Sequence, residues 1–170
     1  FGYRSQLATV NVPNCTYIGE AAFYYCSRLV NISASSCISI GTQAFYACSE
    51  LSSVNFPMCT VIYNSAFYRC SKLATISFPM CTSIYASAFM SCPNLTNVDF
   101  PACTSIGNDA FEACYNLTSV NFPEAKRIGA GAFEYCSKLT NISFPVCTYI
   151  GLYAFNNCGV SSICFPLCTN

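Results

Sequence analysis

Apolar side chains recur along this chain with a period of 22 residues, held with almost no insertion or deletion. Written as a consensus, the unit is L-x-x-[VI]-x-F-P-x-C-T-x-I-G-x-x-A-F-x-x-C-x-x. Self-similarity at a period of about 20 to 50 residues is typical of solenoids, in which each unit packs on its neighbours. We therefore expect residues 1–170 to form a single repeat domain of about seven full units with partial ends. We also expect this domain to be a fragment of a longer array.

The first half of each unit predicts a short β-strand, as in residues 51–56. Its Leu, its Val or Ile, and its Phe are separated by small polar residues, so the apolar side chains should point into the solenoid while the others face outward. The proline after Phe has no N–H group to donate to a ladder, and it should end the strand. Successive strands are expected to pair in parallel along one side of the solenoid.

The second half of each unit predicts a helical turn, as in residues 62–70. Its apolar residues are spaced by three and four positions, which suits one or two turns of α-helix or 3₁₀-helix. Most units carry a glycine just before this segment, which would admit a positive φ there. These glycines are Gly19, Gly41, Gly107, Gly129 and Gly151. Tyr63 and Tyr85 take the same place in two units, so a positive φ cannot be obligatory.

The unit "CSKLTNISFPVCTYIGLYAF", residues 136–155, resembles the BspA-like class of leucine-rich repeats. The resemblance extends over nearly the whole chain. It implies an α/β repeat solenoid, a right-handed horseshoe of 22-residue repeats. Short parallel strands would lie on its concave face and short helical or 3₁₀ turns on its convex face. It also implies a bacterial protein that is extracellular or on the cell surface, of a class associated with adhesion to host or matrix proteins.

Composition narrows the classes of partner. Only 8% of the residues are charged, and seven basic residues balance seven acidic ones. Such a surface has no long-range field to attract nucleic acid or anionic lipid. The uninterrupted apolar runs are a few residues long, whereas a membrane-spanning helix needs about 20. We expect neither nucleic-acid binding nor membrane insertion.

Thirteen of the fifteen cysteines fall into two columns with the 22-residue period; Cys59 belongs to one column and Cys70 to the other. Neighbours within a column point the same way, which disfavours a disulfide. Zinc ligation normally needs closely spaced Cys pairs, and Cys164 with Cys168 is the one such pair in this chain, which has no His. We interpret most of the cysteines as free thiols that fill the core as small apolar groups. The repeat is irregular around Cys158, Cys164 and Cys168, so a disulfide remains open there. No metal or cofactor is expected.

No catalytic motif is present, so we predict a non-enzymatic protein-binding module that uses the concave sheet face. The alternative is a structural spacer or a scaffold that associates end to end with itself. The candidate partner is a host or extracellular matrix protein. The candidate binding residues on the sheet face are Asn11, Asn31, Asn55, Ser77, Asn97, Asp99, Asn121 and Asn141, with Met58 and Met80 as candidates on the rim.

Overall fold

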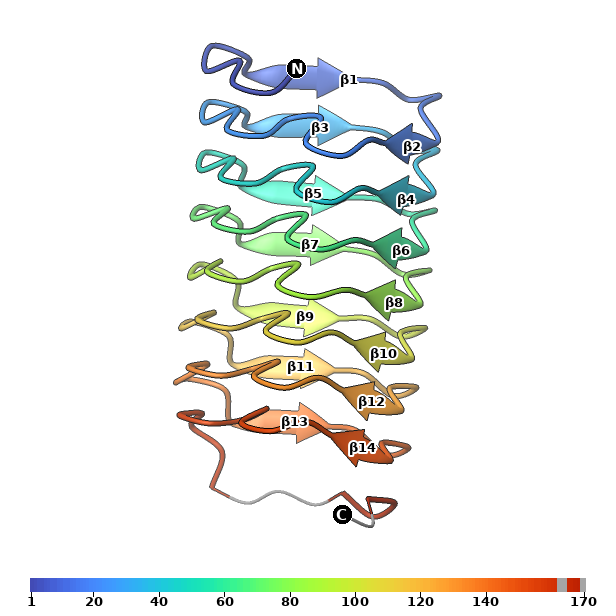
Figure 1. The fold of residues 1–170 in the computed structure, drawn as a ribbon, viewed down its shortest axis with the longest axis vertical. Coiled ribbons are helices and arrows are strands. Elements are labelled where there is room, and N and C mark those ends of the chain that lie inside the picture. The colour runs from blue at the N-terminus through green and yellow to red at the C-terminus, as the bar shows by residue number, and fades with distance from the viewer. Residues whose placement is uncertain (162–164, 169–170) are drawn as a thin grey trace.

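The computed structural model describes residues 1–161 and 165–168. Figure 1 shows a solenoid in which each turn of the chain carries one three-residue strand and one two-residue strand. The three-residue strands are β1 (Thr9–Asn11), β3 (Asn31–Ser33), β5 (Ser53–Asn55), β7 (Thr75–Ser77), β9 (Asn97–Asp99), β11 (Ser119–Asn121) and β13 (Asn141–Ser143). The two-residue strands are β2 (Tyr17–Ile18), β4 (Ser39–Ile40), β6 (Val61–Ile62), β8 (Ser83–Ile84), β10 (Ser105–Ile106), β12 (Arg127–Ile128) and β14 (Tyr149–Ile150).

Each strand pairs in parallel with the equivalent strand of a neighbouring turn, except that the three-residue strands are not paired between β3 and β5 or between β7 and β9. Val10 lies opposite Ile32 between β1 and β3, and Ile106 lies opposite Ile128 between β10 and β12. The two-residue strands join in one seven-stranded sheet, and the three-residue strands form a second column. Both registers equal the 22-residue sequence period, which confirms the predicted parallel strands.

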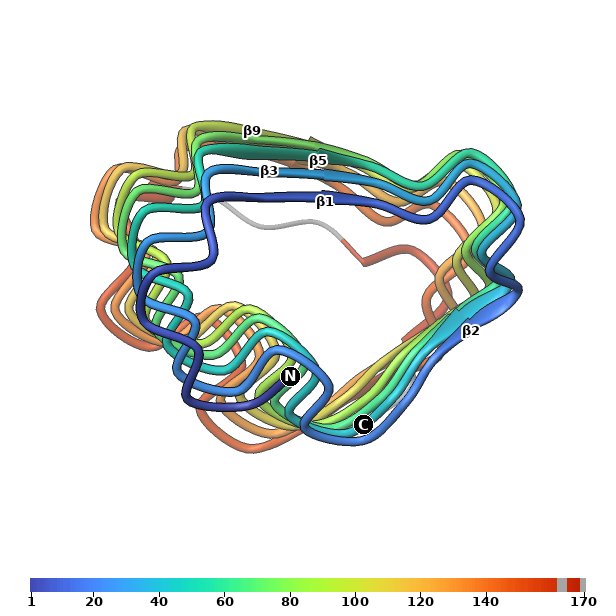
Figure 2. The same ribbon diagram turned by 90° about the horizontal axis from the view of Figure 1, so that it is seen from above.

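The predicted helical turns are wrong, because none of the described residues forms a helix. The third side of each turn is instead a run of tight turns, and Figure 2 shows it closing the loop between the two strand sides. Every second N–H group of this segment donates its hydrogen bond to the next turn, as when the Phe23 nitrogen donates to the Ala44 carbonyl at 2.7 Å. The N–H groups between them stay local, as when the Tyr24 nitrogen donates to the Ala21 carbonyl. A helix would keep all of these bonds within one segment.

This alternation depends on a left-handed backbone at two places in each turn. One is the residue before the alanine of the Ala-Phe pair, and the other is the residue before the following cysteine. The non-glycine residues with positive φ are Tyr3, Ala21, Tyr25, Gln43, Ala47, Ser65, Arg69, Ser87, Ser91, Asp109, Ala113, Tyr135, Tyr153 and Asn157. Gly131 is the glycine that adopts it, at φ 61°. L-residues avoid this region, so interactions between turns must stabilise it.

The five glycines expected to admit a positive φ do not adopt one. Four of them instead allow two turns of the backbone to approach closely. A Cβ on Gly129 would lie 2.5 Å from the Asn108 nitrogen of the preceding turn, and a Cβ on Gly41 would lie 2.7 Å from the Glu20 nitrogen. The glycine preference at this position therefore reflects contact between turns, which one repeat considered alone does not contain.

Replacing Gly131 with alanine is expected to lower the free energy of unfolding by about 1 to 2 kcal/mol. The new Cβ would strain the left-handed backbone and collide with the carboxylate of Asp109. Gly19→Ala is the control, because its Cβ would meet nothing closer than a Tyr17 ring carbon at 3.8 Å. Urea denaturation of both variants measures the difference, and equal stabilities would contradict this explanation.

Figure 1 shows the turns stacked one beneath another along the long axis, as expected for a repeat solenoid. Main-chain hydrogen bonds join successive turns along the two-residue strands and along the turn side, whereas the three-residue strands form separate sheets with breaks between β3 and β5 and between β7 and β9. We name the faces by their strands.

The core consists of two stacks of phenylalanine rings inside the loop. One contains Phe67, Phe89 and Phe111, with ring centroids 5.1 and 5.2 Å apart and nearly parallel planes. The other contains Phe78 and Phe100, which meet the first stack at steep angles, 66° between Phe78 and Phe89. All five rings are buried, as are most of the repeated leucines. The predicted inward positions are confirmed.

Candidate binding surface

The outward side chains of the three-residue strands form one continuous polar face. Each of these strands buries its central Val or Ile at least in part, so the residues on either side of it point outward. The predicted binding residues Asn11, Asn31, Asn55, Ser77, Asn97, Asp99 and Asn121 are all exposed on this face. Asn141 occupies the equivalent place in β13, but its side chain lies outside the described residues. We call this surface the three-residue-strand face.

Two short hydrogen bonds connect neighbouring strands on this face. The Ser119 hydroxyl donates to Asn97 Oδ1 at 2.6 Å, and Asn121 Nδ2 donates to Asp99 Oδ1 at 2.9 Å. Strands β7, β9 and β11 together line a shallow hollow of about 360 Å³ there. The structure thus brings three of the predicted residues, Asn97, Asp99 and Asn121, to a single recess.

The two rim methionines lie away from that hollow. Met58 and Met80 follow the prolines after β5 and β7, and their side chains are 54% and 52% exposed. They take the same place in successive turns, one sequence period apart. Their exposure is compatible with a contact role at the edge of the three-residue-strand face, and no hydrogen bond ties them to it.

A second hollow lies along the turn side, and sequence reasoning missed it. It has a volume of about 510 Å³ and runs from Tyr25 past Arg69 to Tyr115 over a floor of small residues. The Arg69 guanidinium lies 5.3 Å from the centre of the Tyr68 ring. The sequence does contain a pattern that marks this hollow, namely small residues in the turn segments with Tyr25, Arg69 and Tyr115 among them. That pattern has no meaning until the structure shows that these positions point outward.

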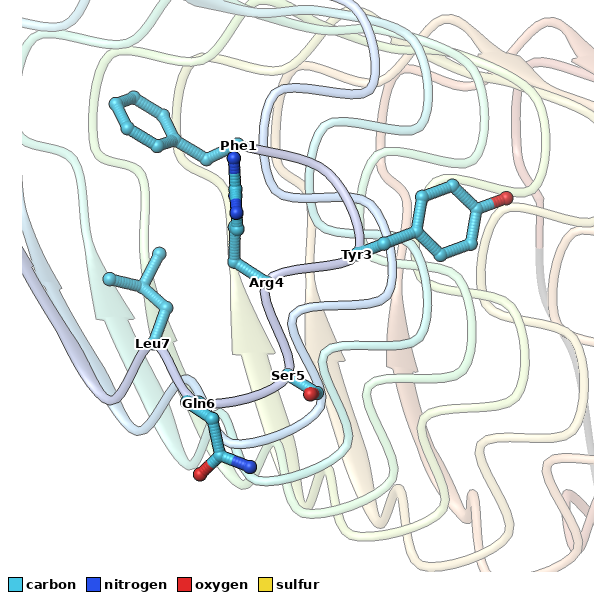
Figure 3. A pocket seen from close by; sticks show the side chains of 6 residues that line it. All are labelled: Phe1, Tyr3, Arg4, Ser5, Gln6 and Leu7. Atoms are coloured by element: carbon cyan, nitrogen blue, oxygen red, sulfur yellow. The ribbon is translucent and has the colours of Figure 1, made fainter.

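A third hollow, of about 540 Å³, lies at the first turn and is lined by residues 1–7 without position 2. Figure 3 shows Phe1 and Leu7 on one side of the ribbon and Tyr3 pointing the other way. The Phe1 ring stacks on Phe23 with centroids 5.9 Å apart. This hollow is therefore the end of the phenylalanine core and carries no separate chemistry.

The described cysteines are free thiols and nearly all of them are buried, as interpreted from the sequence. The structure adds that they donate hydrogen bonds: Cys48 Sγ lies 3.1 Å from the Phe23 carbonyl of the preceding turn, and Cys59 Sγ lies 3.4 Å from the Val61 carbonyl. Burial raises the pKa of the Cys48, Cys59, Cys103 and Cys114 thiols to about 12. Such thiols are neither nucleophiles nor metal ligands at neutral pH.

At the last turn the thiols approach each other more closely. Cys168 Sγ donates to the Cys147 carbonyl at 3.2 Å and lies 4.0 Å from Cys147 Sγ. Cys158 donates to the Phe133 carbonyl, and both Cys158 and Cys168 are free thiols. Cys164, the third member of the group in which a disulfide remained open, lies outside the described residues. Within the described part of the chain, no three potential ligands are placed to hold a metal ion.

Comparison with known proteins identifies similar sequences and structures. The sequence profile of the BspA type leucine-rich repeat region, present in six copies, matches residues 1–118 and 104–170. The structure of a leucine-rich repeat protein from T. pallidum is similar with a TM-score of 0.85 and 32% identity, over 89% of this chain and 77% of that one. No curated protein matches the sequence.

Two further solved structures are similar. A leucine-rich cell surface protein from Faecalibacterium prausnitzii has a TM-score of 0.78 and 26% identity, and a leucine-rich repeat protein from Bacteroides ovatus has a TM-score of 0.75 and 28% identity. The matches cover 91% and 94% of this chain but only 46% and 51% of those proteins, so this chain spans about half of their length. Among the described residues, none forms a helix of the length and hydropathy that a membrane span requires.

Proposed function

Because this chain belongs to the BspA-type leucine-rich repeat family, we propose that it is a protein-binding module of a bacterial surface protein and that it contacts its partner through the three-residue-strand face. Leucine-rich repeat proteins are generally non-enzymatic scaffolds, and those of the BspA type are typically bacterial surface proteins. The expected partner is a host or extracellular matrix protein.

The observation that carries the proposal is the chemistry of the three-residue-strand face. Its described outward side chains, from Asn11 in β1 to Ser143 in β13, are short and almost uncharged, and all but the half-buried Ser119 are exposed. A flat row of amides and hydroxyls can form many hydrogen bonds to a partner without desolvating charges. The recess at Asn97, Asp99 and Asn121 provides a place where a protruding side chain of the partner could be buried.

The proposal predicts that charge placed on this face weakens binding to whichever matrix protein is recognised. The test presents the purified chain to a panel of immobilised extracellular matrix proteins and measures affinity by biolayer interferometry. The double variant Asn55→Lys and Asn121→Lys adds two long cations to the face and is expected to weaken binding by about tenfold or more, since each desolvated charge opposes association.

The matched control is Asn94→Lys with Asn157→Lys, which makes the same chemical change at two exposed positions outside the three-residue strands and outside the rim column of Met58 and Met80. Its affinity should equal that of the unaltered chain. Loss of binding in both double variants would point to a general charge effect and contradict the assignment of the face. If no matrix protein binds at all, the chain is better explained as a spacer.

A further inference from the structure

The two-residue strands carry a feature that the proposed function leaves unexplained. At the residue after these strands most turns have glycine, but two successive turns have Tyr63 and Tyr85. Their rings stack with centroids 5.2 Å apart and planes inclined by 29°. Both side chains are exposed, which places a two-ring stack on the surface of the seven-stranded sheet.

The two ends of this stack differ. On the side of the preceding turn, Tyr17 reaches over Gly41, and its hydroxyl lies 2.9 Å from the place a Gly41 Cβ would take. On the side of the following turn stands Gly107, and the residue equivalent to Tyr17 is Ser83. Among the described residues, Tyr63 is the ring that stacks on Tyr85, and a hollow of about 360 Å³ lies on the side of Gly107. We call this hollow the tyrosine slot.

The rim of the tyrosine slot consists of uncharged hydrogen-bonding groups. Ser83 and Ser105 present half-buried hydroxyls on adjacent strands. The side-chain oxygens of Asn64 and Asn108 accept bonds from the Ala86 and Ala130 nitrogens at 3.1 and 3.0 Å. Those bonds hold both amides in place and leave each Nδ2 group free to donate to a ligand.

No charged side chain lines the tyrosine slot among the described residues. The nearest cation along the sheet is Arg127, the partner of Ser105 in the ladder. Its guanidinium is directed away from the slot, onto the Tyr149 ring of the next turn at 4.3 Å from the centroid. A charged ligand would therefore find no counter-ion in the tyrosine slot. A neutral ligand needs none, so the lack of charge favours it.

We propose that the tyrosine slot binds a neutral pyranose, the terminal ring of a glycan, stacked on the open face of Tyr85. A pyranose has an apolar C–H face, which suits an aromatic ring, and a rim of hydroxyls, which suits Ser83, Ser105, Asn64 and Asn108. An aromatic ligand ring would satisfy the tyrosine but leave these polar groups without partners. The volume of the hollow falls in the range of small-molecule sites, about 300 to 1,000 Å³.

The test is a titration of the ¹⁵N-labelled chain with the methyl glycosides of glucose, galactose, mannose and N-acetylglucosamine, followed by two-dimensional NMR. At least one of them should shift the amide signals of Tyr85, Gly107 and Asn108, with a dissociation constant of about 1 mM, as expected for a ligand of this size. Replacing Tyr85 with alanine should weaken binding about tenfold, because the stacking surface is lost.

A second variant keeps the Tyr85 ring and fills the tyrosine slot. Ser83→Tyr places a ring over Gly107, as Tyr17 already does over Gly41, and should abolish binding without loss of the fold. Tyr115→Ala is the matched control, because Tyr115 is 50% exposed and does not line the slot; its affinity should not change. The proposal is overturned if none of the four glycosides shifts these signals, if Ser83→Tyr still binds, or if p-cresol binds and the glycosides do not. Binding here is independent of the three-residue-strand face, so either proposal can fail alone.

Discussion

Raising the pH from 8 to about 10.5 is expected to unfold this protein at room temperature, even though its 170 residues carry no net charge at neutral pH. Burial raises the pKa of Cys48, Cys59, Cys103 and Cys114 from 9.0 to about 12. It raises the pKa of Cys70 and Cys92 as well. The unfolded chain therefore releases protons from these thiols at a lower pH than the folded chain does.

The direction follows from linkage. A group whose pKa is higher in the folded state contributes stability that is complete below its unfolded pKa, here 9.0, and that is lost as the pH rises toward about 12. Between pH 8 and pH 10 each such thiol withdraws about 1.4 kcal/mol, so four of them withdraw roughly 5 to 6 kcal/mol. This is comparable with the whole free energy of unfolding of a typical domain, about 5 to 15 kcal/mol.

Circular dichroism and the ultraviolet absorbance of thiolate, followed together during an alkaline titration, measure the effect. Loss of the β signal should coincide with the appearance of thiolate in one cooperative step. Two outcomes would contradict the explanation: thiolate forming near pH 9 while the β signal persists, or a folded chain that withstands pH 12. Return to pH 8 under reducing conditions should restore the fold, which separates this transition from oxidation.

Replacing Phe89 with alanine is expected to lower the free energy of unfolding by about 3 to 5 kcal/mol. This ring is fully buried, lies between Phe67 and Phe111 in one stack, and meets Phe78 of the other stack edge-on. Hydrogen bonds between turns hold the backbone along the turn side and the two-residue strands, which limits how far the cavity can collapse. Urea denaturation measures the loss.

Tyr115→Ala is the control for that measurement, because the Tyr115 side chain is 50% exposed and belongs to neither phenylalanine stack. Its effect should stay within about 0.5 kcal/mol. A loss at Phe89 no larger than at Tyr115 would mean that the array is loosely packed or does not unfold as one unit. Because repeats couple mainly to their neighbours, a Phe89 variant with two separate unfolding steps would also reveal how far cooperativity extends along the stack.

The prediction of helical turns was wrong for an identifiable reason. Residues 62–70 space their apolar side chains by three and four, and a helix satisfies that spacing, but so does a run of turns in which right-handed and left-handed residues alternate. The two differ in where the N–H groups bond. In the structure the Phe67 nitrogen donates to the Ala88 carbonyl of the following turn, a partner that a single repeat does not include.

One of the two candidate sites could be predicted from the sequence and the other could not. Alternation along the three-residue strands was sufficient to place Asn55 and Asn121 on one outward face, because successive side chains of a strand point to opposite sides. The tyrosine slot was not predictable. Its residues come from three turns and four side-chain columns, and the open ring of Tyr85 depends on Ser83 and Gly107 lying beside it.

The sequence by itself determined the repeat length, the parallel register, the inward Leu, Val and Phe positions and the burial of the cysteines, because each follows from a periodic pattern within one unit. The tertiary structure alone decided two things: the tight turns that replace helices in the described part of the chain, and the close contact at Gly41 and Gly129. Both result from hydrogen bonds and contacts between turns, and these exist only when one repeat lies against the next.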